Sequence, residues 1–297
     1  MSIHWDPKVN DRLRALHLMA REIVWGMNNG HHRSHRVTRS IEFVDHKEYQ
    51  PGDLLSAIDW KVFARTDKLM IRRQQADTDV DCILLLDASA DMAIGLAGEM
   101  QESLENSRLS KAITAVAALA LMISRRGDSV GLKICAGTGV SHHFIPPSRQ
   151  SLPAIFHALA TVSAHGKADL ASEIGSLTQF LHRKSIVISV SDWMEEPNLW
   201  GPSLEMLAAQ GHDLRALHLY SRREWSLDFP EDIRLISKED TRQVPLDSAA
   251  MKEHFLNVVA EYLEEVHDWA GRGKMIWVEA ALEDSLIQPL VQLLRKR

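Results

Sequence analysis

Residues 81–92 read Asp-Cys-Ile-Leu-Leu-Leu-Asp-Ala-Ser-Ala-Asp-Met, in which an unbroken apolar run is followed by two acids and a hydroxyl group. A continuous apolar run, unlike an alternating one, is typical of a strand that is covered on both faces. Residues 186–190 form a second run of this kind, which leads into Ser191 and Asp192. The two stretches therefore predict buried strands of a mostly parallel sheet.

Apolar runs alternate with helical patterns from residue 80 onward. The predicted strands are 82–87, 129–135, 140–145, 185–191, 214–220 and 274–279, and the predicted helices are roughly 108–126, 149–162, 169–182, 198–210, 250–271 and 284–295. This alternation predicts an α/β fold with a doubly wound, mostly parallel sheet of Rossmann-type topology. Residues 222–247 interrupt the rhythm, and we expect a hairpin there.

The front of the chain has a different character. Helical spacing predicts a helix over 9–27, with Asn10 or Asp11 as its N-cap. A polar, irregular stretch follows from Asn28 to Arg73. Residues 1–80 carry a net charge of +2, whereas residues 81–297 carry −8. We therefore predict two parts: an N-terminal helix with an irregular segment over 1–79, packing on a main domain over 80–297.

Composition narrows the class of protein. The 297 residues carry a formal net charge of −6, which argues against a dedicated nucleic-acid binder. The two cysteines, Cys82 and Cys135, lie in apolar runs without CxxC spacing, which fits a reducing compartment. The N-terminus lacks a signal-peptide pattern, and the longest apolar stretch, 112–123, is too short to cross a bilayer. We expect a cytoplasmic protein without a membrane span.

Acids and hydroxyl groups follow the two buried strands, where open α/β sheets place their ligands. Oxygen ligands of this kind suit Mg²⁺ or another divalent cation. The predicted metal ligands are Asp87, Ser89, Asp91 and Asp192. An alternative interpretation is that Asp87 and Asp192 only cap the turns that follow the strands.

The same residues resemble a known domain, the von Willebrand factor type A domain. The matching motifs are residues 87–92, Ser110-Lys111 at the start of an apolar helix, residues 126–132 and residues 189–192. Upstream, Tyr49-Gln50-Pro51-Gly52-Asp53 and Ile58-Asp59-Trp60-Lys61 resemble the bacterial domain-of-unknown-function family 58, which contains a type A-like domain. The resemblance runs from about residue 30 to the C-terminus.

The resemblance implies a metal ion-dependent adhesion site in degenerate form. Asp87, Ser89 and Asp192 match positions of the adhesion motif, whereas Asp91 replaces its second serine and Ala168 its threonine. Members of the resembled family typically accompany a MoxR-type AAA+ ATPase. The resemblance thus implies a non-enzymatic, protein-binding adaptor in the remodelling or maturation of an unidentified target protein.

Other chemistries have weaker support. The chain has no phosphate-binding GxxxxGK[ST] loop and no GxGxxG fingerprint, and neither Ser34 nor Ser89 lies in a GxSxG elbow. The alternative function is a metal-dependent hydrolase that uses the acidic segment 42–61, in which Asp59-Trp60-Lys61 has the acid-x-Lys form of some nucleases. Four histidines could in principle ligate zinc, but a polar loop is the favoured interpretation; they are His31, His32, His35 and His46.

Overall fold

The computed structural model of the chain describes residues 7–29, 45–49, 58, 62–63, 68–73, 80–94, 107–137, 144–167, 169–226, 233–236, 243–246 and 249–295. The chain divides into two compact units, one made of residues 1–27 with 80–297 and the other of residues 28–79. The larger unit contains the predicted sheet.

Six strands form this sheet in the order β10-β7-β6-β3-β4-β5. Their bounds are β3 Asp81–Asp87, β4 Ser129–Cys135, β5 Phe144–Ser148, β6 Ser185–Ser191, β7 Asp213–Tyr220 and β10 Ile276–Ala281. All neighbours are parallel except β4 and β5, which pair antiparallel at one edge. The strand order reverses beside β3, as in a doubly wound fold. The predicted α/β fold class is confirmed.

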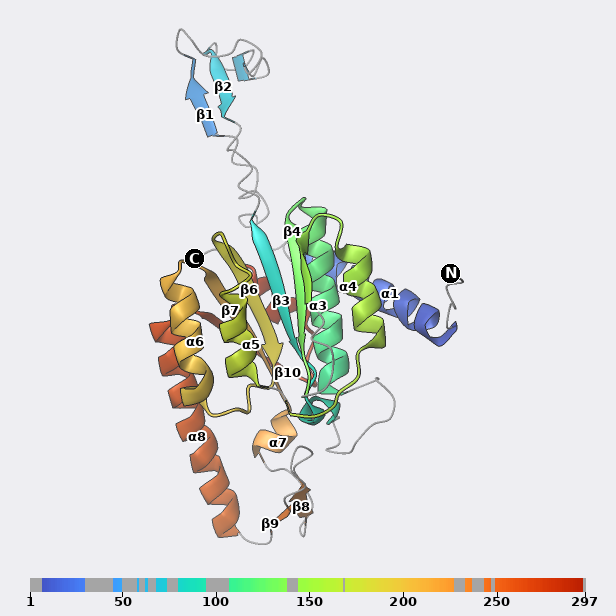
Figure 1. Ribbon diagram of the computed structural model, residues 1–297, viewed down its shortest axis with the longest axis vertical. Coiled ribbons are helices and arrows are strands. Elements are labelled where there is room, and N and C mark those ends of the chain that lie inside the picture. Colours follow the sequence, from blue (N-terminus) through green and yellow to red (C-terminus); the bar gives the residue numbers. More distant parts are fainter. Residues whose placement is uncertain are drawn as a thin grey trace. The chain divides into compact units, whose positions relative to one another are not determined.

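Helices cover both faces of the sheet (Figure 1). Helices α1 (Pro7–Asn29), α3 (Arg108–Arg125), α4 (Leu152–Thr161) and α9 (Ile287–Leu293) pack on one face, and α5 (Leu170–Leu177), α6 (Pro197–Ala209) and α8 (Ala249–Arg272) on the other. Successive side chains of β3 point to opposite faces of the sheet and pack in two hydrophobic cores. Leu84 and Leu86 pack in the core that contains α3, and Ile83 and Leu85 pack in the core on the other face. This is why the run 82–86 is apolar throughout.

Most predicted elements agree with the structure, and two differences have physical causes. The strand predicted at 140–145 overlaps β5, which spans Phe144–Ser148 and so ends later than predicted, because an edge strand tolerates the two prolines that follow Ile145. The predicted N-cap at Asn10 or Asp11 is wrong, because α1 already begins at Pro7, a residue that needs no hydrogen-bond acceptor in the first turn. Residues 140–143 lie outside the described residues.

The predicted hairpin within 222–247 is confirmed: β8 (Ile233–Ile236) pairs antiparallel with β9 (Gln243–Leu246). A short helix, α7 (Arg222–Ser226), links β7 to this excursion. Within the described residues, no helix combines the length and the hydropathy that a membrane span requires.

The N-terminal helix belongs to the same compact unit as the sheet, whereas the predicted division at residue 79 places it with the segment that follows it. Leu16, Ala20, Val24 and Met27 of α1 are buried in the same core as α3, so residues 7–27 belong to the larger unit. The smaller unit contains a two-stranded antiparallel ladder, β1 (Asp45–Glu48) with β2 (Met70–Arg73), within the segment predicted to be irregular. That this unit packs on the main domain stays a prediction.

Candidate functional site

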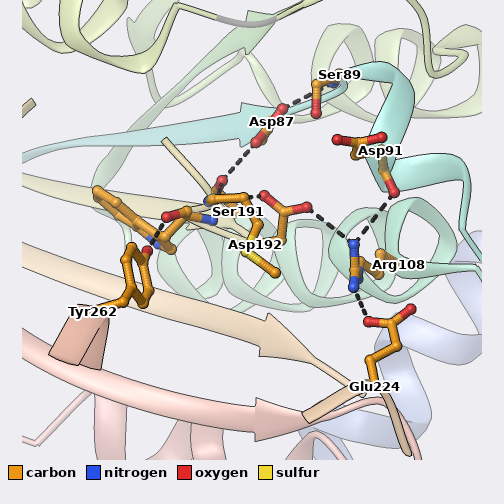
Figure 2. A network of polar contacts seen from close by, with 10 residues as sticks. Asp87, Ser89, Asp91, Arg108, Ser191, Asp192, Glu224 and Tyr262 are labelled. Carbon is orange, nitrogen blue, oxygen red and sulfur yellow. Dashed lines mark hydrogen bonds and ion pairs between the residues drawn. The ribbon is translucent and has the colours of Figure 1, made fainter. Parts of the chain in front are cut away.

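The carboxyl ends of β3 and β6 bring the predicted acids together. The two strands are adjacent and parallel, with Leu86 opposite Val190, so Asp87 and Ser191 end their strands side by side. The Asp87 carboxylate accepts from the backbone N–H of Ser89 at 2.8 Å and from the Ser191 hydroxyl at 2.5 Å. Figure 2 shows these contacts at the ends of the strands. Ser191 was not among the predicted site residues, although it directly precedes Asp192.

Burial governs the charge of Asp87. Only 2% of the residue is exposed. Burial, together with the nearby Asp192 carboxylate, raises the pKa of Asp87 to about 7, while the hydrogen bonds from Ser191 and Ser89 oppose that rise. The Asp87 carboxyl group therefore takes up a proton at a much higher pH than an exposed aspartate does.

The turn after β6 holds the residue that follows Asp192 in an unusual backbone conformation. Trp193, the next residue, has a φ of 56°, in the left-handed region that bulky residues rarely adopt. Two hydrogen bonds hold it there: the Ser191 hydroxyl accepts from the Trp193 N–H at 2.9 Å, and the Tyr262 hydroxyl of α8 donates to the Trp193 carbonyl. Strained backbone that is held by its surroundings is common at functional sites.

A buried arginine faces Asp192 (Figure 2). Arg108, the first residue of α3, donates through Nη1 to Asp192 Oδ2 at 3.1 Å and more weakly to the Asp91 carbonyl at 3.5 Å. Its Nη2 pairs with the Glu224 carboxylate of α7. The Arg108 and Asp192 side chains are only 4% and 5% exposed.

Burial and ion pairing shift the pKa values of Asp192 and Glu224 in opposite directions. Burial raises the pKa values of Asp192 and Glu224, and the guanidinium of Arg108 opposes both rises. Burial thus favours the protonated form of the Asp192 and Glu224 carboxyl groups, and the guanidinium favours the ionised form.

Sequence reasoning missed both Arg108 and Glu224. One local signal marks Arg108: a basic residue directly after the N-cap Ser107 opposes the helix dipole, and therefore needs acidic partners elsewhere. Glu224 has no such signal, because it lies 116 positions further along the chain.

A cavity of about 850 Å³ opens beside these acids. All four predicted metal ligands line it, together with Lys167, Asp169, Leu170, Ala171, Ser172, Met194, Glu195, Glu196 and Leu199. The described lining thus holds six carboxyl groups and one lysine. Met194 and Leu199 are 53% and 58% exposed, which gives the acidic cavity an apolar border.

Two acids of the lining also organise the cavity wall. Asp169 caps α5 by accepting from the Ser172 N–H at 2.8 Å, and Glu195 accepts from the Leu170 N–H at 3.0 Å. Burial raises the pKa of Glu195, against the hydrogen bond that stabilises its ionised form. The loop between β6 and α6 is thereby tied to the start of α5.

The structure places Asp87, Ser89, Asp91 and Asp192 at one cavity, but their binding of a metal stays a prediction. Among the described residues, no group of three or more His, Cys, Asp or Glu side chains has an arrangement that could hold a metal ion. Ala168, the expected threonine position, lies outside the described residues.

The residues of the two alternative chemistries are largely outside the described ranges. Residues 59–61 of the acid-x-Lys pattern lie there, as do His31, His32 and His35. His46 is in β1, opposite Arg72 in the two-stranded ladder. The hydrolase and zinc alternatives therefore stay predictions, because most of their residues lie outside the part of the chain that the structure describes.

A family model described as "Protein of unknown function DUF58" matches residues 45–264. The chain belongs to this family. The match to the DUF58 family includes β1 and β2 of the smaller unit and every strand of the six-stranded sheet except β10. The resemblance noted in the sequence is confirmed over these residues.

Individual proteins are also similar to this chain. An uncharacterized protein of Mycobacterium tuberculosis is 27% identical over 266 residues, which cover 88% of this chain and 81% of the relative. Similar solved structures include the conserved hypothetical protein BatB from Bacteroides thetaiotaomicron, with 17% identity, a TM-score of 0.47, and coverage of 72% of this chain and 96% of that one. The SpRpn10 VWA domain has 12% identity and a TM-score of 0.41, and the match covers 71% of this chain and 93% of that domain.

Proposed function

We propose that this DUF58 protein is a non-enzymatic adaptor that binds another protein at the cavity beside β3 and β6. In this proposal the partner is a MoxR-type AAA+ ATPase, as the family resemblance implies, and the adaptor helps it to remodel or mature a target protein. The observation that carries the proposal is the cavity itself, in which an acidic lining is bordered by exposed Met194 and Leu199.

The lining suggests the chemistry of the bound segment. A cavity with six carboxyl groups and one lysine favours a basic side chain, because opposite charges across an interface steer association and fix its register. The exposed apolar side chains of Met194 and Leu199 would cover an apolar residue next to that basic one. A partner segment with a Lys or Arg beside a Leu, Met or Phe meets both requirements.

Two further observations are consistent with a cytoplasmic adaptor. Cys82 and Cys135 are free and buried, as expected of thiols in a reducing compartment. The sequence has no ATP-binding loop, so the energy for remodelling would come from the partner.

The test is a binding measurement between the purified full-length chain and the MoxR-type ATPase of the same organism, with and without ATP. The double variant Met194→Ser/Leu199→Ser removes two exposed apolar contacts at the cavity, and we expect a dissociation constant 10- to 100-fold higher, on the order of what losing two partly buried contacts costs.

The matched control is Met206→Ser/Leu256→Ser, which removes two exposed apolar side chains, on α6 and α8, that do not line the cavity. This control should bind as tightly as the unmodified protein. Equal weakening by both double variants would contradict the cavity as the docking site, and no measurable binding in either nucleotide state would contradict the ATPase as the partner.

A further inference from the structure

A cation that belongs to the chain lies against Asp192, one of the acids that the adhesion motif would use for a metal. Arg108 Nη1 is 3.1 Å from Asp192 Oδ2, and both side chains are almost fully buried. Nη2 of the same guanidinium pairs with Glu224. One positive charge is thus enclosed between a carboxylate from the end of β6 and another from α7 (Figure 2).

The carboxylate oxygens of two predicted ligands, Asp87 and Asp192, already have protein donors. The two carboxylate oxygens of Asp87 accept from Ser89 N–H and the Ser191 hydroxyl. Those of Asp192 accept from Met194 N–H at 3.3 Å and from Arg108. A buried carboxylate needs such partners, and here all four oxygens have one without any metal.

A divalent cation does not fit this arrangement. It would have to share Asp192 with the guanidinium, and like charges in a buried site repel each other strongly. The motif has also lost its threonine hydroxyl, since the sequence has Ala168 at that position. The residues present therefore disagree with the metal site that the type A resemblance implies.

We infer that Arg108 is the resident cation of this site and takes the place of a divalent metal ion. The guanidinium balances the buried Asp192 and Glu224 carboxylates, and its contact with the Asp91 carbonyl ties the loop after β3 to the start of α3. The folded protein then presents its cavity without needing divalent cations. This inference concerns the charge of the site and is independent of which partner binds there.

The experiment measures the melting temperature and Mn²⁺ binding of the full chain in EDTA and in millimolar Mg²⁺, Ca²⁺ or Mn²⁺. The unmodified protein should show no saturable Mn²⁺ binding and no shift beyond about 1 °C, which is below the shift that 1 kcal/mol of binding would give. This measurement needs no variant to fold, so the prediction that the unmodified protein binds no divalent cation can be contradicted without one.

Removing the guanidinium should create a cation site. Arg108→Gln leaves Asp192 and Glu224 without their buried partner, so we expect a melting temperature lower by about 10 °C in EDTA. Millimolar Mg²⁺ or Mn²⁺ should restore part of that loss, and adding Asp192→Asn should abolish the restoration. Arg183→Gln, which breaks the Arg183–Asp81 pair at the opposite end of β3, is the control and should gain no response.

Two results would overturn the inference. One is saturable cation binding by the unmodified protein that Asp192→Asn removes, which is what the magnesium prediction from the sequence requires. The other is an Arg108→Gln variant that folds and yet gains no response to any of the three cations, because the acids would then have no need of a positive charge.

Discussion

Replacing His218 with phenylalanine should remove about 2 kcal/mol of the destabilisation that acid causes at pH 5. His218 lies on β7 opposite Ser191 and is fully buried. Its ring nitrogens make no well-formed hydrogen bond in the described part of the chain, and the Asp192 backbone nearby offsets only part of the effect of burial on the pKa of the ring. Its ring packs among those of Tyr220, Trp225 and Trp277, with centroids 5.2 to 5.8 Å apart.

The magnitude follows from the pKa of this imidazole. Burial, with a further contribution from the Arg108 guanidinium, lowers the pKa of His218 from 6.5 to about 3. The unfolded chain therefore binds more protons than the folded one between these pH values. The stability that depends on the neutral imidazole is complete above pH 6.5 and is lost as the pH falls toward 3. At about 1.4 kcal/mol per pH unit, the loss at pH 5 is about 2 kcal/mol.

The assay is urea unfolding of the protein and of His218→Phe at pH 7.5 and at pH 5. Each protein is compared with itself at the two pH values, so a fixed cost of fitting the phenylalanine ring cancels. The unmodified protein should lose about 2 kcal/mol more than His218→Phe. His157→Gln, on the exposed face of α4, is the control and should keep the full acid loss. An equal loss in His218→Phe and the unmodified protein would refute the reasoning.

Further predictions concern packing, the ion pair and the thiols. In urea unfolding, Gly201→Ala should lower the free energy of unfolding by about 1–3 kcal/mol, because a Cβ there would collide with the Trp269 ring. Gly271→Ala, which has open space around it in α8, should raise the free energy of unfolding by about 0.5–1 kcal/mol. Equal effects of the two substitutions would contradict this packing. Glu224→Gln should cost about 2–4 kcal/mol by removing one partner of the buried Arg108, and a loss under about 0.5 kcal/mol would contradict the pair. Both cysteines are buried, so thiol reagents should modify neither until the protein unfolds, and fast labelling of the native protein would show that a core is open.

The sheet could be predicted because its information is local. β4 and β6 occupy the residues predicted for them, since a strand that is covered on both faces must be apolar at successive positions. The placement of Asp87 and Asp192 at one edge followed from the rule that parallel strands end together. The family match over residues 45–264 agrees with the motifs from which the domain was recognised.

The rest depends on contacts between distant parts of the chain, which no local pattern encodes. Arg108 meets Asp192 and Glu224 across 84 and 116 residues, so the cation that neutralises the site is absent from any motif around the acids. Helix α1 was assigned to the segment that follows it, but Ala20 and Val24 pack in the core of the larger unit. The four-residue strands β1 and β2 are too short to give a clear periodic signal.

The central claim is that the cavity beside β3 and β6 is where a partner protein docks. Hydrogen–deuterium exchange of the full chain, alone and with the MoxR-type ATPase, tests this most directly. We expect slower exchange over residues 192–199, which form the cavity border, and no change in the exposed face of α8. Slower exchange confined to other segments of a bound chain, with residues 192–199 unchanged, would contradict it.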